Sequence, residues 1–508
     1  MITPNTNIRL LKVPFEIARK NQLTFASLEA QTNYFLSLSH LEYDNTTYQR
    51  QNNVIRFEAP IDDIRTYNYV MYKNESYSDK WFYAYITNME YKNDNTTDIT
   101  IQIDVFQTWQ FDIVYNRMFV EREHVNNDTI GAHTYPENLE TGELIIDGID
   151  SFNMGANKYI IQCTEWINYQ EGDPKPLATN YGGIFGAGGA YICSTIIEVV
   201  NILQAFTNND SVFAVYMVPE SFINNTEQGM RFNQPAPVTQ TKTINKPSTL
   251  NSYTPRNNKL LTFPFCFLNV SNNNGSSNTF QYELFKDTDC NFKLKGVPTI
   301  GGSIKCVPIN YKIENTDGTE EEGLMAGKFP TLSWSADEFT NWLTQNAVNI
   351  GLGVASNLLT IIGGVASGNP VIGVAGITSG GMGIANTLGQ VYEHSLTPNS
   401  ARGNTNAGDI NTCTNTNTFY FYKMSIKEEY ARIIDNFFSL YGYKVNDLKI
   451  PNVNGRTNWN YVKTIDCNIT GEIPQEDLQE LKNMFDNGVT FWHNPATFLD
   501  YSQNNAIV

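Results

Sequence analysis

The chain has 508 residues, of which 41% are hydrophobic, 13% aromatic and 17% charged, and its formal net charge is −18 at pH 7. This length is enough for two to four domains, because a single hydrophobic core stops growing at roughly 250–300 residues. Few charges and many aromatic residues exclude a disordered chain or a coiled coil, and favour a mainly β fold with a few helices (α+β). The acidic balance excludes a protein that grips nucleic acid, since cationic contacts to phosphates supply that affinity.

The N-terminal segment indicates the compartment in which the chain is made, and the cysteines indicate whether disulfides or zinc sites are expected. Residues 1–20 lack a basic segment followed by an unbroken apolar run, so we expect no secretory signal and synthesis in a cytoplasm. The cysteines are scattered and form no CxxC pair, so neither a disulfide framework nor a zinc knuckle is expected. They are Cys163, Cys193, Cys266, Cys290, Cys306, Cys413 and Cys467.

Strand patterns dominate residues 1–125. From Ile99 to Val105 apolar and polar residues alternate, which predicts a strand with one face on a core. The aromatic run from Trp81 to Tyr91 predicts a second strand, and residues 92–95 between the two runs have turn chemistry. We therefore expect a long β-hairpin in this part of the chain.

Residues 136–330 have the pattern of an inserted all-β region, because Gly, Pro, Ser and Asn repeatedly interrupt short apolar runs. Between Lys259 and Phe285, two such runs flank the polar residues 271–277. This arrangement predicts another hairpin.

Two capping boxes predict the starts of helices. Ser335 with Glu338, and Ser425 with Glu428, have the spacing at which a hydroxyl and a carboxylate satisfy the first turn. The second of these helices is expected to end at Gly442 and to bury one stripe of side chains. The stripe consists of Ile426, Tyr430, Ile433, Phe437 and Tyr441.

A third helix is predicted from Pro474 to Asp486, with Gly488 beyond its end. Its apolar residues recur at helical spacing, so one side of this helix should face the core. These residues are Leu478, Leu481 and Phe485.

One segment carries no charge. Between Glu338 and Glu393 there is no Asp, Glu, Lys or Arg. Its two Gly-rich apolar arms, 347–366 and 371–388, are each about long enough to cross a hydrocarbon layer of roughly 30 Å as a helix. The turn residues between the arms predict an apolar hairpin.

Two interpretations of this hairpin stay open. It could be a buried helix pair in the core of the protein, or a segment that enters a membrane under some condition. The many glycines argue against a rigid core element, because Gly costs roughly 1 kcal/mol per helical position relative to Ala. Asn346, Asn349 and Asn357 argue against a permanently spanning helix, so the second interpretation is favoured.

Other function classes have weaker support in the sequence. A glycan hydrolase needs two carboxylates a few Å apart, and neither Asp62-Asp63 nor Glu428-Glu429 provides them. The glycines at 182–189 lack the Lys-Ser/Thr of a phosphate-binding loop, and the histidines form no metal-binding pair. A receptor-binding adhesin would share the composition but would not need the uncharged hairpin. A secreted pore-forming toxin would share the hairpin but would need an export signal.

Both ends of the chain carry long aromatic strings. They are KWFYAYITNMEYKN (80–93), IDVFQTWQFDI (103–113), VEREHV (120–125), FFSLYGYKVN (437–446), RTNWNYVKT (456–464) and GVTFWHNP (488–495). These strings and the placement of the apolar hairpin resemble the tail-knob proteins of small short-tailed bacteriophages with protein-primed linear DNA, the Picovirinae-like podoviruses. The middle part matches that family in patches such as KLLTFPFCFLNVSNNNG (259–275).

This resemblance implies a homohexameric ring that forms the distal tube of a virion tail and is assembled in the host cytoplasm. The apolar loops would plug the lumen and then enter the host membrane as a channel for the genome. The implied partners are other copies of the chain, an upper tail or lower collar protein, the host cell membrane and the passing double-stranded DNA, which is not read by sequence. No cofactor, no metal site and no catalytic residue is expected.

The resemblance also implies a division of the chain. Residues 1–135 and 406–508 would form the tube wall, 136–330 the inserted knob domain, and 331–405 a helix that leads into the membrane-active loop. We expect the loop to be hinged at Asp337 and Glu338 before it and at Glu393 and His394 after it. Its membrane-active side chains are expected to be Ile350, Leu352, Val354, Leu358, Leu359, Ile361, Ile362, Val365, Val371, Ile372, Val374, Ile377, Met382, Ile384 and Leu388.

Overall fold

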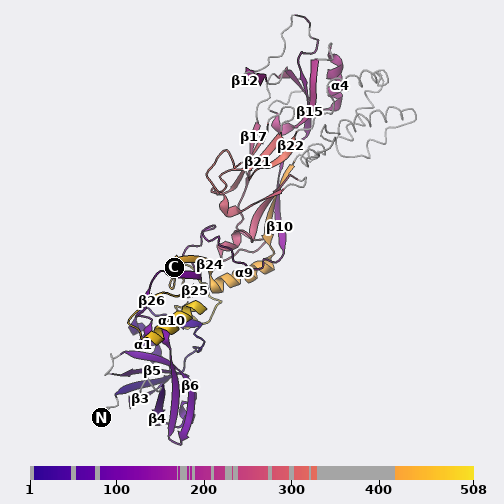
Figure 1. The fold of residues 1–508 in the computed structure, drawn as a ribbon. Helices are drawn as coiled ribbons and strands as arrows, with labels where there is room; N and C mark the ends of the chain where they lie inside the picture. Colours follow the sequence, from indigo (N-terminus) through magenta and orange to yellow (C-terminus); the bar gives the residue numbers. More distant parts are fainter. Residues whose placement is uncertain are drawn as a thin grey trace, which may run out of the picture. The chain divides into compact units, whose positions relative to one another are not determined.

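The chain forms two compact units in the computed structural model (Figure 1). The first comprises Met1–Thr141, Tyr253–Leu260 and Glu428–Val508, and the second comprises Gly142–Ser252 and Leu261–Lys427. The division into four parts that the sequence suggests stays a prediction. The structure describes residues 5–46, 53–74, 80–168, 170–171, 180–181, 184–185, 189–206, 211–223, 231–232, 238–272, 277–296, 303–319, 322–328 and 418–508.

The first unit contains a six-stranded antiparallel sheet in the order β3-β1-β5-β6-β7-β4. Side chains that alternate along these strands fill hydrophobic clusters on the two faces of the sheet, as a half-buried strand requires. The strands are β1 (Thr6–Leu11), β3 (His40–Thr46), β4 (Val54–Phe57), β5 (Tyr69–Asn74), β6 (Trp81–Asn93) and β7 (Thr96–Ile103).

The hairpin predicted in this region is confirmed, because β6 pairs with β7 in antiparallel register. Ile99 and Ile101 are buried on β7 whereas Gln102 is exposed, in keeping with the alternation. The predicted extension of the strand to Val105 is wrong. The Asp104 carboxylate accepts a hydrogen bond from the Gln107 backbone N–H and so starts a short helix at Val105.

A five-stranded sheet in the order β2-β27-β25-β9-β24 and a small β8-β26 pair complete the strands of the first unit. Helices α1, α2, α3 and α10 and strands β9, β25 and β27 contribute to clusters that are continuous with the six-stranded sheet. The elements are β2 (Asn21–Leu23), β8 (Val114–Tyr115), β9 (Met118–Glu123), β24 (Tyr443–Lys449), β25 (Trp459–Ile465), β26 (Ile469–Thr470), β27 (Val489–Trp492), α1 (Leu28–Ser37), α2 (Ile61–Ile64), α3 (Val105–Trp109), α9 (Glu428–Tyr441), α10 (Gln475–Asn487) and the 3₁₀ turn η8 (Pro495–Thr497).

The helix predicted from the second capping box exists as α9, but its start and its buried side differ from the prediction. Ser425 belongs to the preceding strand, and the helix begins at Glu428. The buried residues are Ala431, Ile434, Asp435 and Phe438, whereas the predicted stripe residues Ile433 and Tyr441 are 65% and 40% exposed. The core side of the helix carries the buried carboxylate of Asp435, a polar residue that a pattern of apolar residues alone does not include.

The helix predicted near the C-terminus is confirmed as α10, and Gly488 lies at its C-cap with a φ of 87°. Leu481 and Phe485 are buried, and Leu478 packs against the same core cluster. A carboxylate accompanies them on this side, since Asp477 accepts a hydrogen bond of 2.8 Å from the indole N–H of Trp109.

The second unit is built from antiparallel sheets, in the orders β10-β23-β18-β19, β17-β20-β21-β22 and β15-β11-β14-β16, with a β12-β13 pair. Phe292 on β20 packs edge-on against Phe421 on β23, so aromatic side chains join the first two of these sheets. The elements are β10 (Leu144–Asn153), β11 (Asn157–Cys163), β12 (Asn180–Tyr181), β13 (Ile184–Phe185), β14 (Gly189–Cys193), α4 (Ile196–Ala205), β15 (Val212–Pro219), η3 (Glu220–Phe222), β16 (Arg231–Phe232), β17 (Val238–Ile244), β18 (Cys266–Ser271), β19 (Ser277–Phe280), η5 (Tyr282–Leu284), β20 (Cys290–Gly296), β21 (Ser303–Pro308), β22 (Leu324–Lys328) and β23 (Thr418–Ile426). The 3₁₀ turn η4 (Asn258–Leu261) belongs to the first unit up to Leu260.

The hairpin predicted between Lys259 and Phe285 is confirmed as the antiparallel pair β18 and β19. The predominance of strands over helices confirms the fold class. The helix predicted to start at Ser335 lies outside the described residues.

Substitution of Gly442 by Ala should destabilise the first unit. Gly442 follows α9 with a φ of 65°, and a Cβ there would lie 2.0 Å from the backbone oxygen of Glu123. We expect the free energy of unfolding to fall by about 2 kcal/mol or more, because both the strain and the clash involve backbone. Urea denaturation followed by tryptophan fluorescence would measure the loss.

Gly148→Ala is the matched control. The nearest atom to a Cβ at Gly148 is a Lys423 side-chain carbon at 3.5 Å, which is ordinary contact. Its free energy of unfolding should stay within about 0.5 kcal/mol of the wild type. Equal losses in the two variants would contradict the role assigned to Gly442.

Candidate functional site

The predicted loop and hinge residues lie outside the described residues, in the segment 329–417. The assignments of the hinges and of the membrane-active side chains therefore stay predictions. The structure does describe the strands that precede and follow this segment, β22 and β23, and both belong to the second unit.

The strand that leads out of the segment is firmly held. β23 lies between two partners and pairs with β10 from Leu144↔Ile426 to Asn153↔Thr418, and with β18 from Cys266↔Ser425 to Ser271↔Tyr420. Phe419 and Phe421 are fully buried on one face. A pull on this end of the segment would have to break backbone hydrogen bonds on both sides of the strand and remove two phenyl rings from the core.

An ion pair adds to the β10–β23 contact. The Lys423 ammonium lies 2.9 Å from a carboxylate oxygen of Asp150, and Lys242 lies 3.5 Å from the other. The hydrogen bond from Lys423 holds the pKa of Asp150 below its usual value. The pair is partly exposed, so its contribution to stability is small compared with that of the strand hydrogen bonds.

The strand that leads into the segment, β22, has a different environment. β22 pairs with β21 alone and is the last strand of its sheet in the described part of the chain. Its register with β21 shifts between Ser303 and Lys305. The two ends of the segment are therefore anchored unequally, the outgoing end in the middle of a sheet and the incoming end at an edge.

A buried carboxylate organises the first unit just after β23. Asp435 on α9 is fully buried and accepts hydrogen bonds from the Tyr253 hydroxyl at 2.5 Å and from both the backbone and the side-chain amide of Asn257, at 3.1 and 2.7 Å. These contacts hold the segment Tyr253–Leu260 on the helix. Burial raises the pKa of Tyr253 to about 12, so its hydroxyl stays protonated and continues to donate.

A second buried carboxylate lies in the loop that follows β9. Glu137 is paired with Arg122 and Lys259 and accepts a hydrogen bond of 2.9 Å from the backbone N–H of Lys444. Three parts of the chain that are distant in sequence meet at this group. Removing both of its charged partners would leave the carboxylate of Glu137 buried without an ion pair, which is more costly than losing a surface ion pair.

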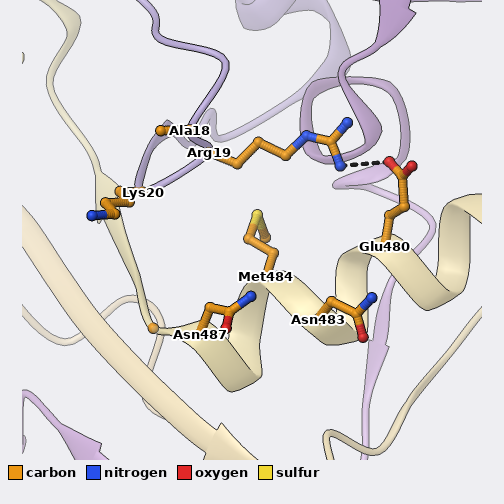
Figure 2. A pocket seen from close by; sticks show the side chains of 8 residues that line it. Ala18, Arg19, Lys20, Glu480, Asn483, Met484 and Asn487 are labelled. Carbon is orange, nitrogen blue, oxygen red and sulfur yellow. Dashed lines mark hydrogen bonds and ion pairs between the residues drawn. The ribbon is translucent and has the colours of Figure 1, made fainter.

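Figure 2 shows a surface pocket of about 430 Å³ between α10 and the loop before β2. The Arg19 guanidinium crosses it to the Glu480 carboxylate at 2.5 Å and also donates to the Ile103 carbonyl at 3.1 Å. The basic residues Arg19 and Lys20 line it with the last turns of α10, where the helix dipole favours cations. The pairing therefore ties the loop to the helix, and the polar lining does not point to a particular ligand.

Two further observations concern membranes and metals. Among the residues that the structure describes, none of the helices has the length and apolar character to cross a bilayer. In the same residues, no three His, Cys, Asp or Glu side chains come together as metal ligands.

Comparison with known proteins identifies the family. Residues 231–506, more than half of the chain, match the family model described as Bacillus phage phi29, tail knob protein gp9, C-terminal domain. The chain belongs to the phage tail knob proteins. Residues 4–115 also match the model of the N-terminus of the caudoviral major tail protein. The recognition made from the aromatic strings is thus confirmed.

Individual tail knob proteins align over almost the whole chain. The tail knob protein gp9 of Bacillus phage PZA is 27% identical, with 96% of each chain covered, and that of Bacillus phage phi29 is 26% identical with the same coverage. The solved structure of the bacteriophage C1 tail knob protein, gp12, matches with a TM-score of 0.66 and 17% identity, and covers 99% of this chain and all of that one. The last match supports the fold.

Family membership confirms the structural role and the location. The protein is a structural component of the virion tail, as the aromatic strings suggested. Sequence reasoning missed the anchoring strand β23, although the alternation of Phe and Tyr in residues 419–422 was a signal for it. It also missed the buried Asp435 and Glu137, because their partners are distant in the sequence.

Two histidines, the buried His124 and the partly buried His493, make the stability of the first unit depend on pH. His124 donates from Nε2 to the Ser439 carbonyl, and its Nδ1 accepts from the Tyr461 N–H at 2.7 Å. Burial, with the nearby charge of Arg456, lowers the pKa of His124 to about 3. Burial lowers the pKa of His493 to about 4. Both imidazoles therefore stay neutral in the folded unit at neutral pH.

The free energy of unfolding should fall as the pH is lowered from 7 to 5. Unfolded histidine takes up a proton near pH 6.5, whereas the folded unit does so near 3 and 4, so below pH 6.5 protons favour unfolding. Each histidine should contribute a loss of about 2 kcal/mol over this range. Urea denaturation at a series of pH values would measure the slope.

His493→Gln should remove about half of this slope, because one of the two shifted groups is gone. His133→Gln is the control, since His133 makes an exposed hydrogen bond through Nε2 to the carbonyl of Asn127. That variant should keep the wild-type slope. An unchanged slope in His493→Gln would contradict the prediction.

Proposed function

We propose that this tail knob protein forms a homohexameric tube at the distal end of the tail, and that its apolar loops first plug the lumen and then enter the host membrane as a channel for the genome. The observation that carries the proposal is the segment without charge between Glu338 and Glu393, in a chain whose family is a component of phage tails. A tail that delivers DNA must pass the host membrane, and this segment is the part of the chain that lipid would accept.

The position of the segment supports the proposal. It connects β22 to β23, and β23 is held on both sides by strand partners. A segment that leaves its stored position and enters lipid needs a fixed anchor, or it would pull the fold apart. The central strand β23 provides such an anchor at the outgoing end.

The net charge of the chain supports a role as a conduit for DNA. The formal net charge of −18 is the opposite of what a protein that binds phosphates needs. A tube with acidic subunits would repel the phosphates of the DNA and let it slide. The implied partners are further copies of the chain, an upper tail or lower collar protein, the host membrane and the passing duplex.

We propose that the protein is not an enzyme. The relatives with curated names are called tail knob proteins, without a catalytic activity in the name. A receptor-binding adhesin or a glycan hydrolase of the tail is the alternative. Liposome leakage separates the proposals, because neither alternative needs to perforate a membrane.

Deletion of residues 350–388 should abolish leakage and leave assembly intact. The purified wild type should form rings with six-fold symmetry by electron microscopy and release dye from liposomes. The deletion removes the apolar side chains but neither anchoring strand, so the rings should persist while leakage falls to the level of buffer. Unchanged leakage would contradict the membrane role, and a wild type without rings would contradict the tube.

A matched control replaces residues 350–388 by a Gly-Ser linker of the same length. This variant keeps the length of the loop but not its apolar surface. It should form rings and fail to release dye, as the deletion does. If it leaks like the wild type, the activity depends on the length of the chain between β22 and β23 and not on apolar insertion.

The trigger for release is expected at the hinges. No side chain between Glu338 and Glu393 titrates between about pH 4 and 8, so a response to pH cannot arise within the segment. Protonation of a carboxylate removes a charge that resists entry into lipid, whereas protonation of His394 adds one. We therefore expect the acidic hinge residues to control the pH at which the loop is released.

The triple variant Asp337→Asn, Glu338→Gln and Glu393→Gln should shift liposome leakage toward neutral pH. His394→Gln is the control and should change the pH profile little. Dye release at a series of pH values would measure both. If the triple variant keeps the wild-type profile, or if the wild type leaks equally at all pH values, the trigger is mechanical, such as DNA pressure or receptor contact.

A further inference from the structure

An exposed row of apolar side chains crosses three neighbouring strands of the first unit. Leu448 on β24 lies directly opposite Phe119 on β9, and Phe119 lies directly opposite Ile465 on β25. Residues that pair directly across strands point to the same face of a sheet. The exposed fractions are 57% for Leu448, 38% for Phe119 and 49% for Ile465.

The opposite face of the same strands belongs to the core. Met118 and Val120, which flank Phe119 along β9, are buried, as are Val462 and Thr464 on β25. The three side chains of the row therefore lie on the outer face and are not part of the core. Contiguous exposed apolar side chains with a polar rim are typical of an interaction site.

The charges around the row are of both signs. Glu121 and Lys463, neighbours on the same two strands, form an ion pair of 2.7 Å. The exposed Arg117 donates to the carbonyl of Leu448 at 3.3 Å, and Lys449 is paired with the buried Glu123. Such a mixed rim is not the cluster of basic residues that an anionic membrane surface or a nucleic acid would select.

We propose that this row, extended by Ile450 after the end of β24, is the face on which a second copy of the chain packs. The inference rests on the proposed ring and names the part of each subunit that holds it together. Ile450 is 55% exposed, and β24 is the last strand of its sheet in the described part of the chain. The row thus reaches the border of the sheet, where a neighbouring subunit has access to it.

Electrostatics favours a copy of the same chain as the occupant. With a formal charge of −18 on each copy, subunits repel one another at most of their surface. A face with charges of both signs around an apolar centre lets two copies approach at a lower electrostatic cost. In a ring of more than two subunits the contact is heterologous, so the row of one copy meets a different surface of the next.

Leu448→Asp and Ile465→Asp, each made in the full chain, test the inference. An aspartate in the centre of a buried contact should raise the apparent dissociation constant of the ring about thirtyfold or more. Size-exclusion chromatography with light scattering, over a range of protein concentrations, would measure the change. Both side chains are about half exposed in one copy, so the melting temperature of the monomer should change little.

Ile433→Asp is the matched control. Ile433 lies on α9 of the same unit and is 65% exposed, but it does not belong to the row. Its substitution adds the same charge and should leave the rings intact. Dissociation in this variant to the same degree would show that added negative charge alone breaks the ring, and would overturn the inference.

The remaining outcomes are also decisive. If the wild type forms rings and both Asp variants keep them at wild-type concentrations, the row is not the contact and only this inference fails. If the wild type stays monomeric, the proposed tube fails as well.

If an Asp variant misfolds by circular dichroism, the uncharged double variant Leu448→Ser and Ile465→Ser replaces it and must show weakened rings. Liposome binding by wild-type monomer that is lost in Leu448→Asp would assign the row to lipid instead.

Discussion

The first unit depends on hydrogen bonds between strands from opposite ends of the chain. β2 pairs in parallel with β27, and β9 lies between β24 and β25, so segments that are more than 300 residues apart share one sheet. This pairing closes the first unit. The second unit is an insertion whose ends return to the first, and the uncharged segment is in turn an insertion within the second unit.

Buried carboxylates reinforce this closure at the points where the chain passes between the units. Asp435, which follows β23 in the sequence, binds the short segment Tyr253–Leu260, and Glu137 joins the loop after β9 to Lys259 and Lys444. Each of these groups is satisfied by several donors, as a buried charge requires. A chain that crosses between units several times needs such fixed points, because a hydrophobic contact alone would not define the register of a short crossing segment.

Local patterns in the sequence were sufficient to predict the elements that depend on contacts between residues close together in the chain. The hairpin of β6 and β7, the hairpin of β18 and β19, and α10 with Gly488 follow from alternation, turn residues and helix caps. The prediction failed where a long-range contact overrode the local signal. Ser425 has the spacing of a helix cap, yet it lies in β23 because pairing with β10 and β18 satisfies its backbone.

The candidate functional features also divide into one that the sequence alone reveals and one that depends on long-range contacts. The absence of charge between Glu338 and Glu393 is a property of consecutive residues, so the sequence alone was enough to single out this segment. Phe119, Leu448 and Ile465 are ordinary apolar residues in three distant strings, and only the strand register brings them into one row. A hydrophobic residue in a strand next to buried neighbours gives no sign of which face it occupies until that register is known.

These two apolar features place opposite demands on one chain. In the proposed function the loop segment leaves its stored position, and its many glycines and its attachment at the edge strand β22 would keep the cost of that movement low. The row on β24, β9 and β25 lies on strands whose opposite face is buried in the core, so under the same proposal it would stay in place while the loop moves. An assembly that opens a membrane has to keep its own subunits together during that step. Because the loop segment belongs to the second unit and the row to the first, the proposed release of the loop would not loosen the proposed contact between subunits.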